Sequence, residues 1–302
     1  MANPLVGIII LNWNNAPDTI QCVTAVLESD YEPYEIIVVD NCSHDDSVQQ
    51  IRTRFPQVTI IQNPENLGYA QGNNVGMEYA LDKQVDYILI LNDDTVVAPN
   101  MITELVKAAL ANPNPGILGP KIYSQEEPGV LLTTGAYLGE AGVIDNPAMG
   151  VVDTGQWNHQ AEVGYLWGAA VLLKDTAVRQ AGMLDPEFFA YQEDIDWCYR
   201  IRAAGFQCLF IPEAKCWHPD TRRARQNSAL VTYYMSRNHL LFIRKHHLGF
   251  GEFVKSWAVF LRRILSWSIR PKWKNKRHQR DALVRGLIDY TLGRFGKANF
   301  TF

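Results

Sequence analysis

VGIIILN (residues 6–12), EIIVVD (35–40) and DYILILN (86–92) are three short apolar runs, and they decide the fold of this chain. Each run is rich in Ile, Leu or Val and ends in a polar residue, which is typical of a strand buried on both faces of a parallel sheet. A fourth strand is expected in VTIIQ, at 58–62. Segments with a helical pattern separate these runs, near 17–29, 45–54 and 70–82. This alternation predicts an α/β fold with a mainly parallel central sheet flanked by helices.

The rest of the chain divides into two regions of different pattern. Residues 112–165 are rich in Gly, Pro and Thr and weakly periodic, so we expect loops and short strands there. Beyond about residue 225 the pattern becomes helical and basic. We therefore predict an α/β domain over 1–224 and a basic, amphipathic helical region over 225–302.

Charge is distributed unevenly, because residues 215–302 hold 19 of the 28 Lys and Arg residues but 4 of the 32 acidic ones. This asymmetry favours a basic surface that meets anionic lipid, phosphate or nucleic acid, although the two parts of the chain could also neutralise each other. Between Phe253 and Trp267, apolar and aromatic residues recur at helical spacing among basic ones. Such a helix can lie in a membrane interface or pack on the main domain, and the pattern leaves both open.

The sequence also bears on where the protein works. The five cysteines show no CxxC spacing, which fits a reducing cytoplasm and argues against a disulfide framework or a zinc knuckle. The amino terminus, MANPLVGIIILNWNN, lacks the basic region of a signal peptide. No apolar run approaches the roughly 18 residues of a membrane-spanning helix. We therefore expect a cytoplasmic protein.

Acidic side chains follow two of the predicted strands, where nucleotides bind in open α/β sheets. A carboxylate at Asp40 can accept the imide N–H of uracil or thymine, although an aspartate there can also be an ordinary turn former. Asn92, Asp93 and Asp94 leave the strand at 86–92. A divalent cation held by Asp94 could bridge diphosphate oxygens, and oxygen ligands favour Mg²⁺ or Mn²⁺. The same residues could instead form a helix-capping turn.

The segment NPENLGYAQGNN (63–74) combines glycine with amide side chains. Glycine lets the backbone approach a ligand, and Asn66, Asn73 and Asn74 offer amide hydrogen bonds, whereas a plain loop with a capped helix explains the same composition. The glycines concerned are Gly68, Gly72 and Gly76. No lysine follows them, which argues against a P-loop kinase or ATPase.

FFAYQEDIDWCYR (188–200) places an acidic pair at the start of a predicted helix. Adjacent helical positions point in different directions, so of Glu193 and Asp194 one could be a general base while the other orients a substrate. A solvated acidic helix start explains the charge but not the flanking aromatics. His218 would complete a metal site if the loops bring it near Asp94, although a lone histidine beside a tryptophan is more often structural.

Taken in order, these motifs resemble family 2 glycosyltransferases with the GT-A fold, and most of all the rhamnosyltransferase-type branch of that family. The series is ILNWNN, VVDNCSHDDS, NLGYAQGNN, LNDDT, GAAVLLK, FFAYQEDIDWCYR and WH, over about residues 5–220, and YYMSRNHLLFIRK extends it weakly to about 247. Each motif is modest alone, but the ordered series is specific. The resemblance implies a Rossmann-like nucleotide-diphospho-sugar transferase fold in which residues 1–110 bind the nucleotide sugar and 111–224 the acceptor.

The resemblance also implies a role for each motif residue. Asp194 would be the general base, His218 an additional metal ligand, and Asn92 and Asp94 would stand in the family's DxD metal motif. Because the first acidic position of that motif is here an amide, metal binding is either weaker or carried by Asp94 with help from Asp93 and His218. The remaining implied residues are Asn12, Trp13, Asp40, Asn66, Gly68, Asn73, Asn92 and Asp93 at the nucleotide sugar, Glu193 beside the base, and Trp167 and Gly168 at the acceptor.

The implied reaction is an inverting, Mg²⁺- or Mn²⁺-dependent transfer of a sugar, rhamnose favoured, from a dTDP- or UDP-linked donor to a hydroxyl of a surface polysaccharide or lipid-linked glycan. A lipid-linked acceptor would explain basic carboxyl-terminal helices at an anionic inner leaflet, so we expect a peripheral location at the plasma membrane. A sugar-phosphate nucleotidylyltransferase has a related core, but it uses a Lys- or Arg-containing phosphate signature that LNWNNAPD lacks. A non-catalytic lipid- or nucleic-acid-binding protein would leave the acidic pair unexplained, so no nucleic-acid partner is expected.

Overall fold

The computed structural model describes residues 3–139, 144–221 and 227–300 of the chain. These residues fall into two compact units. Unit 1 comprises 1–137, 146–184 and 194–220, and unit 2 comprises 138–145, 185–193 and 221–302. The predicted domain boundary between 224 and 225 lies outside the described residues. Two segments that we expected in the α/β domain, 138–145 and 185–193, are part of unit 2.

Unit 1 is built on a mixed sheet. Its strands are β1 Val6–Asn12, β2 Tyr34–Asp40, β3 Thr59–Gln62, β4 Tyr87–Asn92, β5 Val96–Val97, β6 Pro115–Ser124, β7 Leu131–Thr133, β10 Ala161–Glu162, β11 Ala170–Lys174 and β12 Gln207–His218. Outside this sheet, β8 Tyr137–Leu138 and β9 Ile144–Asp145, which belong to unit 2 except for Tyr137, form a separate pair. The order is β10-β12-β6-β11-β4-β1-β2-β3, with β5 beside β12 and β7 beside β6. The α/β prediction is confirmed, and β1 to β4 are parallel as expected. The sheet is mixed, because β11 runs antiparallel between β4 and β6, while β12 runs parallel to β6.

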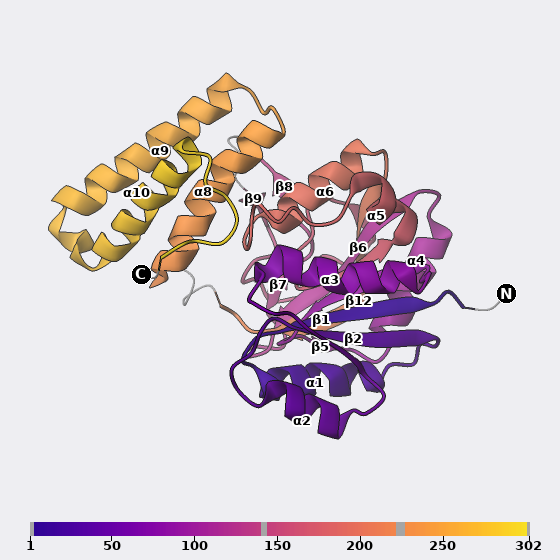
Figure 1. The fold of residues 1–302 in the computed structure, drawn as a ribbon. Coiled ribbons are helices and arrows are strands. Elements are labelled where there is room, and N and C mark those ends of the chain that lie inside the picture. Colours follow the sequence, from indigo (N-terminus) through magenta and orange to yellow (C-terminus); the bar gives the residue numbers. More distant parts are fainter. Residues whose placement is uncertain (1–2, 140–143, 222–226, 301–302) are drawn as a thin grey trace. The chain divides into compact units, whose positions relative to one another are not determined.

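Helices cover both faces of this sheet. They are α1 Ala16–Leu27, α2 Ser47–Arg54, α3 Gly68–Asp82, α4 Met101–Ala111, α5 Asp175–Ala181 and α6 Glu193–Ala203. Successive side chains of a strand point to opposite faces. Ile8 and Ile10 therefore join the main core cluster with residues of α1, α2 and α4, whereas Ile9 faces α3. Figure 1 shows α3 on one side of β1 and β2, and α1 and α2 on the other.

Two glycines of α3 serve packing rather than ligand approach, which corrects our expectation for them. An added Cβ would lie 2.7 Å from the side chain of Leu11 at Gly72 and 2.6 Å from that of Ile9 at Gly76. Both glycines therefore let α3 lie close against the sheet. Gly68 has a φ of 78° instead, a backbone conformation that favours glycine.

The expectation of loops and short strands in the middle of the chain is wrong for β6. Every residue from Pro115 to Ser124 is buried in one continuous strand. An added Cβ would lie 2.6 Å from Ile201 at Gly116 and 2.7 Å from Leu166 at Gly119. These glycines make room for neighbouring side chains, a packing demand that residue periodicity does not reveal.

Unit 2 contains a bundle of helices. They are α8 Ala229–Lys245, α9 Phe250–Ile269 and α10 Arg277–Thr291, with the 3-10 turn η2 at Pro271–Lys276, drawn in orange to yellow in Figure 1. Leu240, Phe260, Leu283 and Leu287 form a common core of α8, α9 and α10. The helical pattern predicted for this region is confirmed. Within the described ranges, none of the helices has both the length and the apolar character that a membrane crossing requires.

Candidate functional site

The ends of several strands bring the predicted site residues to one edge of the sheet. Asn12, Asp40 and Asn92 end the parallel strands β1, β2 and β4. Because β11 is antiparallel to both β4 and β6, β6 runs in the direction of β4. The strand β12 runs parallel to β6 and ends in His218. This is the edge at which open α/β sheets bind nucleotides.

Asp40 is deeply buried, and both of its carboxylate oxygens accept hydrogen bonds. Oδ1 accepts from Nδ2 of Asn12 at 2.7 Å, and Oδ2 accepts from the backbone N–H of Ser43 at 3.0 Å. Asn12, also fully buried, accepts through its Oδ1 from the hydroxyl of Thr19 at 2.8 Å. The protein's own groups therefore hold this corner rigidly. The neighbouring Trp13 is 53% exposed, so its ring is available to a ligand.

The Gly/Asn loop is held by Asn41, which the sequence did not single out. Nδ2 of Asn41 donates to the carbonyl of Gly68 at 3.0 Å. Asn66 accepts through Oδ1 from the backbone N–H of Gly68 at 2.8 Å. Asn73 donates to a backbone carbonyl one helical turn earlier at 2.9 Å, and its buried Oδ1 has no hydrogen-bond partner among the described residues. Asn66 and Asn73 thus shape the loop and the helix, and their contact with a donor stays a prediction.

Asn92, Asp94 and His218 form a small cluster that suits a divalent cation. Nδ1 of His218 lies 2.8 Å from the carbonyl oxygen of Pro219, which accepts its proton and leaves Nε2 with a lone pair. Nε2 therefore accepts a hydrogen bond from Nδ2 of Asn92 at 3.1 Å and also lies 3.1 Å from Oδ1 of Asp94. Oδ1 of Asp94 and Oδ1 of Asn92 are buried without a hydrogen-bond partner in the described parts of the chain. A buried carboxylate oxygen facing an imidazole lone pair is unfavourable unless a proton or a cation lies between them.

The donor set of this cluster fits Mg²⁺ or Mn²⁺, because it combines carboxylate and amide oxygens with a neutral imidazole. No group of three or more His, Cys, Asp or Glu side chains that could hold a metal occurs in the residues that the structure describes. The third ligand of the cluster would be the amide oxygen of Asn92, whose amide group would turn so that Oδ1 rather than Nδ2 faces Nε2 of His218. The remaining coordination positions would fall to oxygens of a ligand such as a diphosphate.

Asp93 has a separate partner beside this cluster. Its Oδ2 accepts from Nδ2 of Asn15 at 3.0 Å. Burial and the neighbouring charge of Asp94 raise the pKa of Asp93 to about 7, although the bond from Asn15 acts in the opposite direction. Near neutral pH, Asp93 therefore holds a proton in part of the molecules, which reduces the negative charge of the acidic pair.

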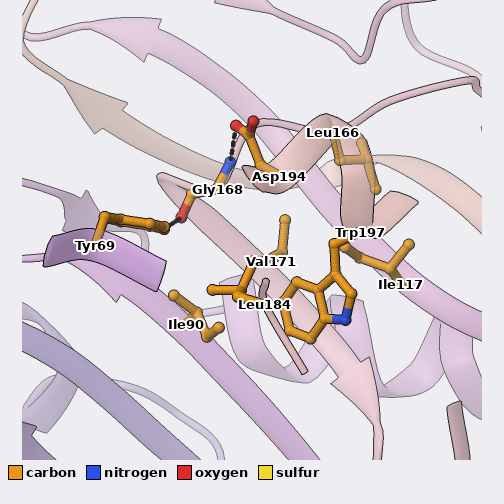
Figure 2. A pocket seen from close by; sticks show the side chains of 9 residues that line it. All are labelled: Tyr69, Ile90, Ile117, Leu166, Gly168, Val171, Leu184, Asp194 and Trp197. Atoms are coloured by element: carbon orange, nitrogen blue, oxygen red, sulfur yellow. Dashed lines mark hydrogen bonds between the residues drawn. The ribbon is translucent and has the colours of Figure 1, made fainter. Parts of the chain in front are cut away.

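Asp194, the second residue of α6, is oriented by backbone and side-chain donors. Its Oδ2 accepts from the hydroxyl of Tyr165 at 2.8 Å and from the N–H of Gly168 at 3.2 Å. Its Oδ1 accepts from the N–H of Ile195 at 2.9 Å. Figure 2 shows the carboxylate bonded to Gly168 at the edge of a small apolar cavity, while the carbonyl of Gly168 accepts from the hydroxyl of Tyr69 at 2.7 Å.

A bridge of two residues connects Asp194 with the cation cluster. The N–H of Gly168 binds Asp194, and the carbonyl of the next residue, Ala169, accepts the N–H of Asn92 at 2.9 Å. The two carboxylate sites therefore share one edge of the sheet. This is the convergence that the motifs predict.

The other residues predicted near the acceptor have different surroundings. Trp167 is partly buried and packs against the main core cluster, so its contact with an acceptor stays a prediction. At Gly168, an added Cβ would lie 2.7 Å from the hydroxyl of Tyr69 and 3.5 Å from Cβ of Asp194. Glu193 is 5% exposed and belongs to unit 2, whereas Asp194 belongs to unit 1. The role of Glu193 also stays a prediction.

Sequence reasoning missed four residues that shape the site, namely Asn15, Asn41, Tyr69 and Tyr165. Asn15 and Asn41 closely follow the first two strands, and Tyr69 lies within the Gly/Asn motif, so their position beside a motif was a usable signal. Tyr165 lies in the weakly periodic middle region, where nothing in the neighbouring sequence distinguished it.

Comparison with known families decides the class of this protein. The model of glycosyl transferase family 2 matches residues 7–160, which is about half of the chain, and that of glycosyl transferase family group 2 matches 87–271. The chain belongs to glycosyl transferase family 2. The predicted family is confirmed, and the nucleotidylyltransferase and the non-catalytic binding protein are not favoured.

This glycosyltransferase is similar to proteins named for rhamnosyl transfer. It is 23% identical over 301 residues to the N-acetylglucosaminyl-diphospho-decaprenol L-rhamnosyltransferase of Mycobacterium tuberculosis, an alignment that covers 92% of this chain and 97% of that protein. It is 22% identical over 221 residues to the dTDP-rhamnosyl transferase RfbF of Shigella flexneri, with 70% and 72% covered. The predicted resemblance to the rhamnosyltransferase branch is confirmed.

The fold of this glycosyltransferase also occurs among solved structures. The mannosyltransferase PcManGT from Pyrobaculum calidifontis, in complex with GDP-Man and Mn²⁺, matches with a TM-score of 0.62 at 14% identity, covering 97% of this chain and 88% of that chain. At this identity the likeness shows the fold alone. The predicted GT-A fold is confirmed.

Proposed function

We propose that this glycosyltransferase moves a sugar from a nucleoside-diphosphate sugar to a hydroxyl of a glycan or lipid-linked acceptor, with inversion at the anomeric carbon. The observation that carries the proposal is the bridge of Gly168 and Ala169 between Asp194 and Asn92. It supports transfer because proton removal from an acceptor and departure of a diphosphate must occur at neighbouring positions.

In the proposed step, Asp194 accepts the proton of the acceptor hydroxyl while the hydroxyl oxygen forms a bond to the anomeric carbon. The bond from that carbon to the diphosphate oxygen breaks, and its electron pair leaves with the diphosphate. Tyr165 and Gly168 keep the carboxylate in orientation through their hydrogen bonds at 2.8 and 3.2 Å. Glu193 would orient the acceptor beside the base.

A divalent cation, Mg²⁺ or Mn²⁺, is the proposed cofactor. Oδ1 of Asp94, Nε2 of His218 and Oδ1 of Asn92 would hold it, and the carbonyl of Pro219 would keep the imidazole in its ligating tautomer. When bound, such an ion stabilises the negative charge that develops on the diphosphate. Support comes from the two buried oxygens without a hydrogen-bond partner in the described residues, and from the Mn²⁺ in the PcManGT complex.

We favour dTDP-rhamnose as the donor, with UDP-linked sugars next. Support comes from the names of the two relatives, a dTDP-rhamnosyl transferase and an L-rhamnosyltransferase. A carboxylate offers about four acceptor positions, so Asp40 can accept the imide N–H of thymine beyond the bonds it already makes. Trp13 and Asn12 would line the base pocket. The donor's ribose and phosphates would contact Asn66, Gly68, Asn73, Asn92 and Asp93.

The proposed acceptor is a lipid-linked or polysaccharide glycan that reaches Asp194 past Trp167 and Gly168. Support comes from the Mycobacterium tuberculosis relative, whose name specifies an N-acetylglucosaminyl-diphospho-decaprenol.

A screen of sugar nucleotides tests the proposed function. A ligand that binds the native state alone raises stability with its concentration relative to Kd. We expect dTDP- or UDP-linked sugars to raise Tm in the presence of Mn²⁺, and we expect a stabilising donor to support transfer to a polyprenyl-diphosphate sugar. If no nucleoside-diphosphate sugar changes Tm or is consumed, the proposal is wrong.

We also propose that unit 2 lies on an anionic membrane, at the cytoplasmic face of the plasma membrane. The supporting feature is a set of apolar residues at helical spacing on one face of α9 that are 46% to 81% exposed, namely Phe250, Val254, Leu261, Leu265 and Ile269. The bundle core, in contrast, is contacted by another face that carries Phe260. Basic residues border the exposed stripe at Lys255 and Arg262 and recur five times in 270–277. An apolar stripe bordered by cations suits the interface of an anionic bilayer.

Co-sedimentation with lipid vesicles tests this location. Replacing Leu261 and Leu265 together by Gln should weaken binding to vesicles that contain phosphatidylglycerol, and phosphatidylcholine vesicles should bind the unmodified protein less. Leu110→Gln is the matched control, since Leu110 is 65% exposed on α4 of unit 1. Unchanged partitioning of the double variant would refute the membrane contact.

A further inference from the structure

The segment 185–193, which leads directly into α6, has an unusual backbone. Phe189, Tyr191 and Gln192 have positive φ values of 62°, 69° and 72°. Residues other than glycine rarely adopt this left-handed region, and such conformations persist where surrounding contacts hold them. Asp194 follows this segment without a linker, so the backbone of the segment leads directly into the first turn of α6.

Asn238 of α8 binds the middle of this segment. Its Nδ2 donates to the carbonyl oxygens of Phe188 at 2.9 Å, Ala190 at 2.9 Å and Tyr191 at 2.8 Å, and because the amide has two N–H protons, one proton is shared between two of these acceptors. Its Oδ1 accepts from Nε of Arg237 at 3.0 Å, and the whole residue is 0% exposed. One buried amide therefore holds three of four consecutive carbonyls in place.

Arg237, the preceding residue of α8, is also 0% exposed and binds the same segment. Its Nη2 donates to the carbonyls of Glu187 at 3.2 Å and Phe188 at 3.1 Å, and its Nη1 donates to the carbonyl of Gly296 at 2.7 Å. A buried guanidinium is unfavourable unless its donors are satisfied, and here backbone carbonyls and the side-chain oxygen of Asn238 accept from it. Aromatic rings 5.0 to 5.9 Å from Cζ complete its surroundings, those of Tyr233, Tyr234 and Phe295.

The ends of the segment are bound to α8 as well. Lys245 forms an ion pair with Asp185 at the start, and Nε2 of Gln192 donates to the carbonyl of Met235 at 3.4 Å near the end. The helix α8 therefore contacts the segment at its start, middle and end. Hydrogen bonds to backbone carbonyls at several points constrain the path of the chain more tightly than apolar packing would.

We infer that Arg237 and Asn238 are positioning residues for glycosyl transfer, because they hold segment 185–193 in the left-handed shape from which α6 and Asp194 begin. The inference rests on the proposed role of Asp194 as general base. Both residues act through the backbone rather than on the substrate. This assigns a role to the Arg-Asn pair within YYMSRNHLLFIRK, which lies more than 40 residues beyond the acidic motif.

Variants of Asn238 test the inference. Asn238→Ala removes the three bonds, and Asn238→Asp keeps the size but turns acceptor oxygens toward three carbonyls. We expect each to lower kcat about 10²-fold, the order of effect that a misplaced catalytic group produces. The KM for the donor and the Tm increase caused by Mn²⁺ and nucleotide should be unchanged. Arg237→Lys keeps the charge but loses the planar fork, so its kcat should fall less.

Leu240→Ala is the matched control. Leu240 is buried in the same helix and contributes to the bundle core, without a hydrogen bond to segment 185–193 from its side chain. It should lose as much thermal stability as Asn238→Ala but keep its kcat. Hydrogen exchange in 185–193 should be faster in Asn238→Ala and unchanged in Leu240→Ala.

Two results would overturn the inference: wild-type kcat in both Asn238 variants, or an equal loss of kcat in Leu240→Ala at matched thermal stability. Failure of the proposed function is distinguishable from both, because it would appear as absence of transfer in the unmodified protein.

Discussion

Two carboxylates at the same edge of unit 1 have opposite surroundings. Asp194 accepts hydrogen bonds from donors that include Tyr165 and Gly168, so its orientation is complete without a ligand. Asp94 presents a buried Oδ1 with no hydrogen-bond partner in the described residues, 3.1 Å from Nε2 of His218. The protein itself therefore holds the carboxylate of Asp194 in place, whereas the surroundings of the Asp94 carboxylate favour a bound cation.

Among the variants that test this difference, Asp194→Asn should have the largest effect on the rate of transfer. An amide cannot take a proton from the acceptor hydroxyl, so kcat for transfer should fall about 10²- to 10⁴-fold. The Tm increase caused by Mn²⁺ and donor nucleotide should remain, because the cation cluster is intact. Steady-state transfer assays measure the effect, and turnover at the wild-type rate would remove Asp194 from the catalytic role.

A third carboxylate, Asp153, extends the comparison because a cation already neutralises it. Its Oδ2 lies 2.9 Å from Nζ of Lys121, whose side chain is 0% exposed. Asp153→Ala would leave a buried ammonium without a counter-charge, which typically costs about 3 to 5 kcal/mol of stability. Urea denaturation measures this loss. Adding Lys121→Met should recover most of it, and a single variant as stable as the wild type would contradict the account.

Replacing Asp94 should not destabilise the cation-free protein, in contrast to replacing Asp153. Without a cation, Asp94→Asn should leave Tm unchanged or slightly raised, because it removes a buried charge. With Mn²⁺ at 100 times its Kd, the wild type should gain about 2.7 kcal/mol, and Asp94→Asn and His218→Ala should lose that gain. Asp194→Asn is the control that keeps it. A full Mn²⁺-induced shift in both cluster variants would place the cation elsewhere.

The smallest effect concerns acid stability. Burial raises the pKa of Asp153, but hydrogen bonds from Tyr123 and Lys121 outweigh burial and hold that pKa at about 2. In the unfolded chain the carboxyl of Asp153 has a pKa of about 3.9, so the unfolded state binds a proton more readily than the folded state. The stability that the Asp153 carboxylate contributes is therefore lost as the pH falls from about 4 to 2. The stability difference between wild type and Asp153→Asn should shrink across this window. A difference that is constant from pH 5 to pH 2 would contradict the assignment.

The sequence alone predicted the features of the fold that follow from the periodicity of apolar residues in strands. The apolar runs at 6–12, 35–40 and 86–92 become β1, β2 and β4, the last beginning at Tyr87. Since the carboxyl ends of parallel strands share one edge, the order of strands and helices along the chain was enough to assign Asp40 and Asp94 to the same edge. His218 joins them because β12 runs in the same direction.

Features that depend on tertiary packing could not be predicted in this way. Gly116 and Gly119 interrupt the apolar pattern that would predict the buried strand β6, because these positions must leave space for the side chains of Ile201 and Leu166. The hydrogen bond from Tyr165 to Asp194 joins residues 29 positions apart in a region without periodicity. The attachment of segment 185–193 to α8 depends on side chains about 50 residues away, and local propensity carries no information on such partners.

A crystal structure of the protein soaked with Mn²⁺ and dTDP, with the cation located by anomalous scattering, tests directly whether Asp94 and His218 hold a cation beside Asp194. We expect one strong anomalous peak within about 2.0 to 2.3 Å of Asp94 Oδ1 and His218 Nε2, next to diphosphate oxygens that face Asp194. A peak coordinated by other residues, or a diphosphate bound away from Asp194, would contradict it.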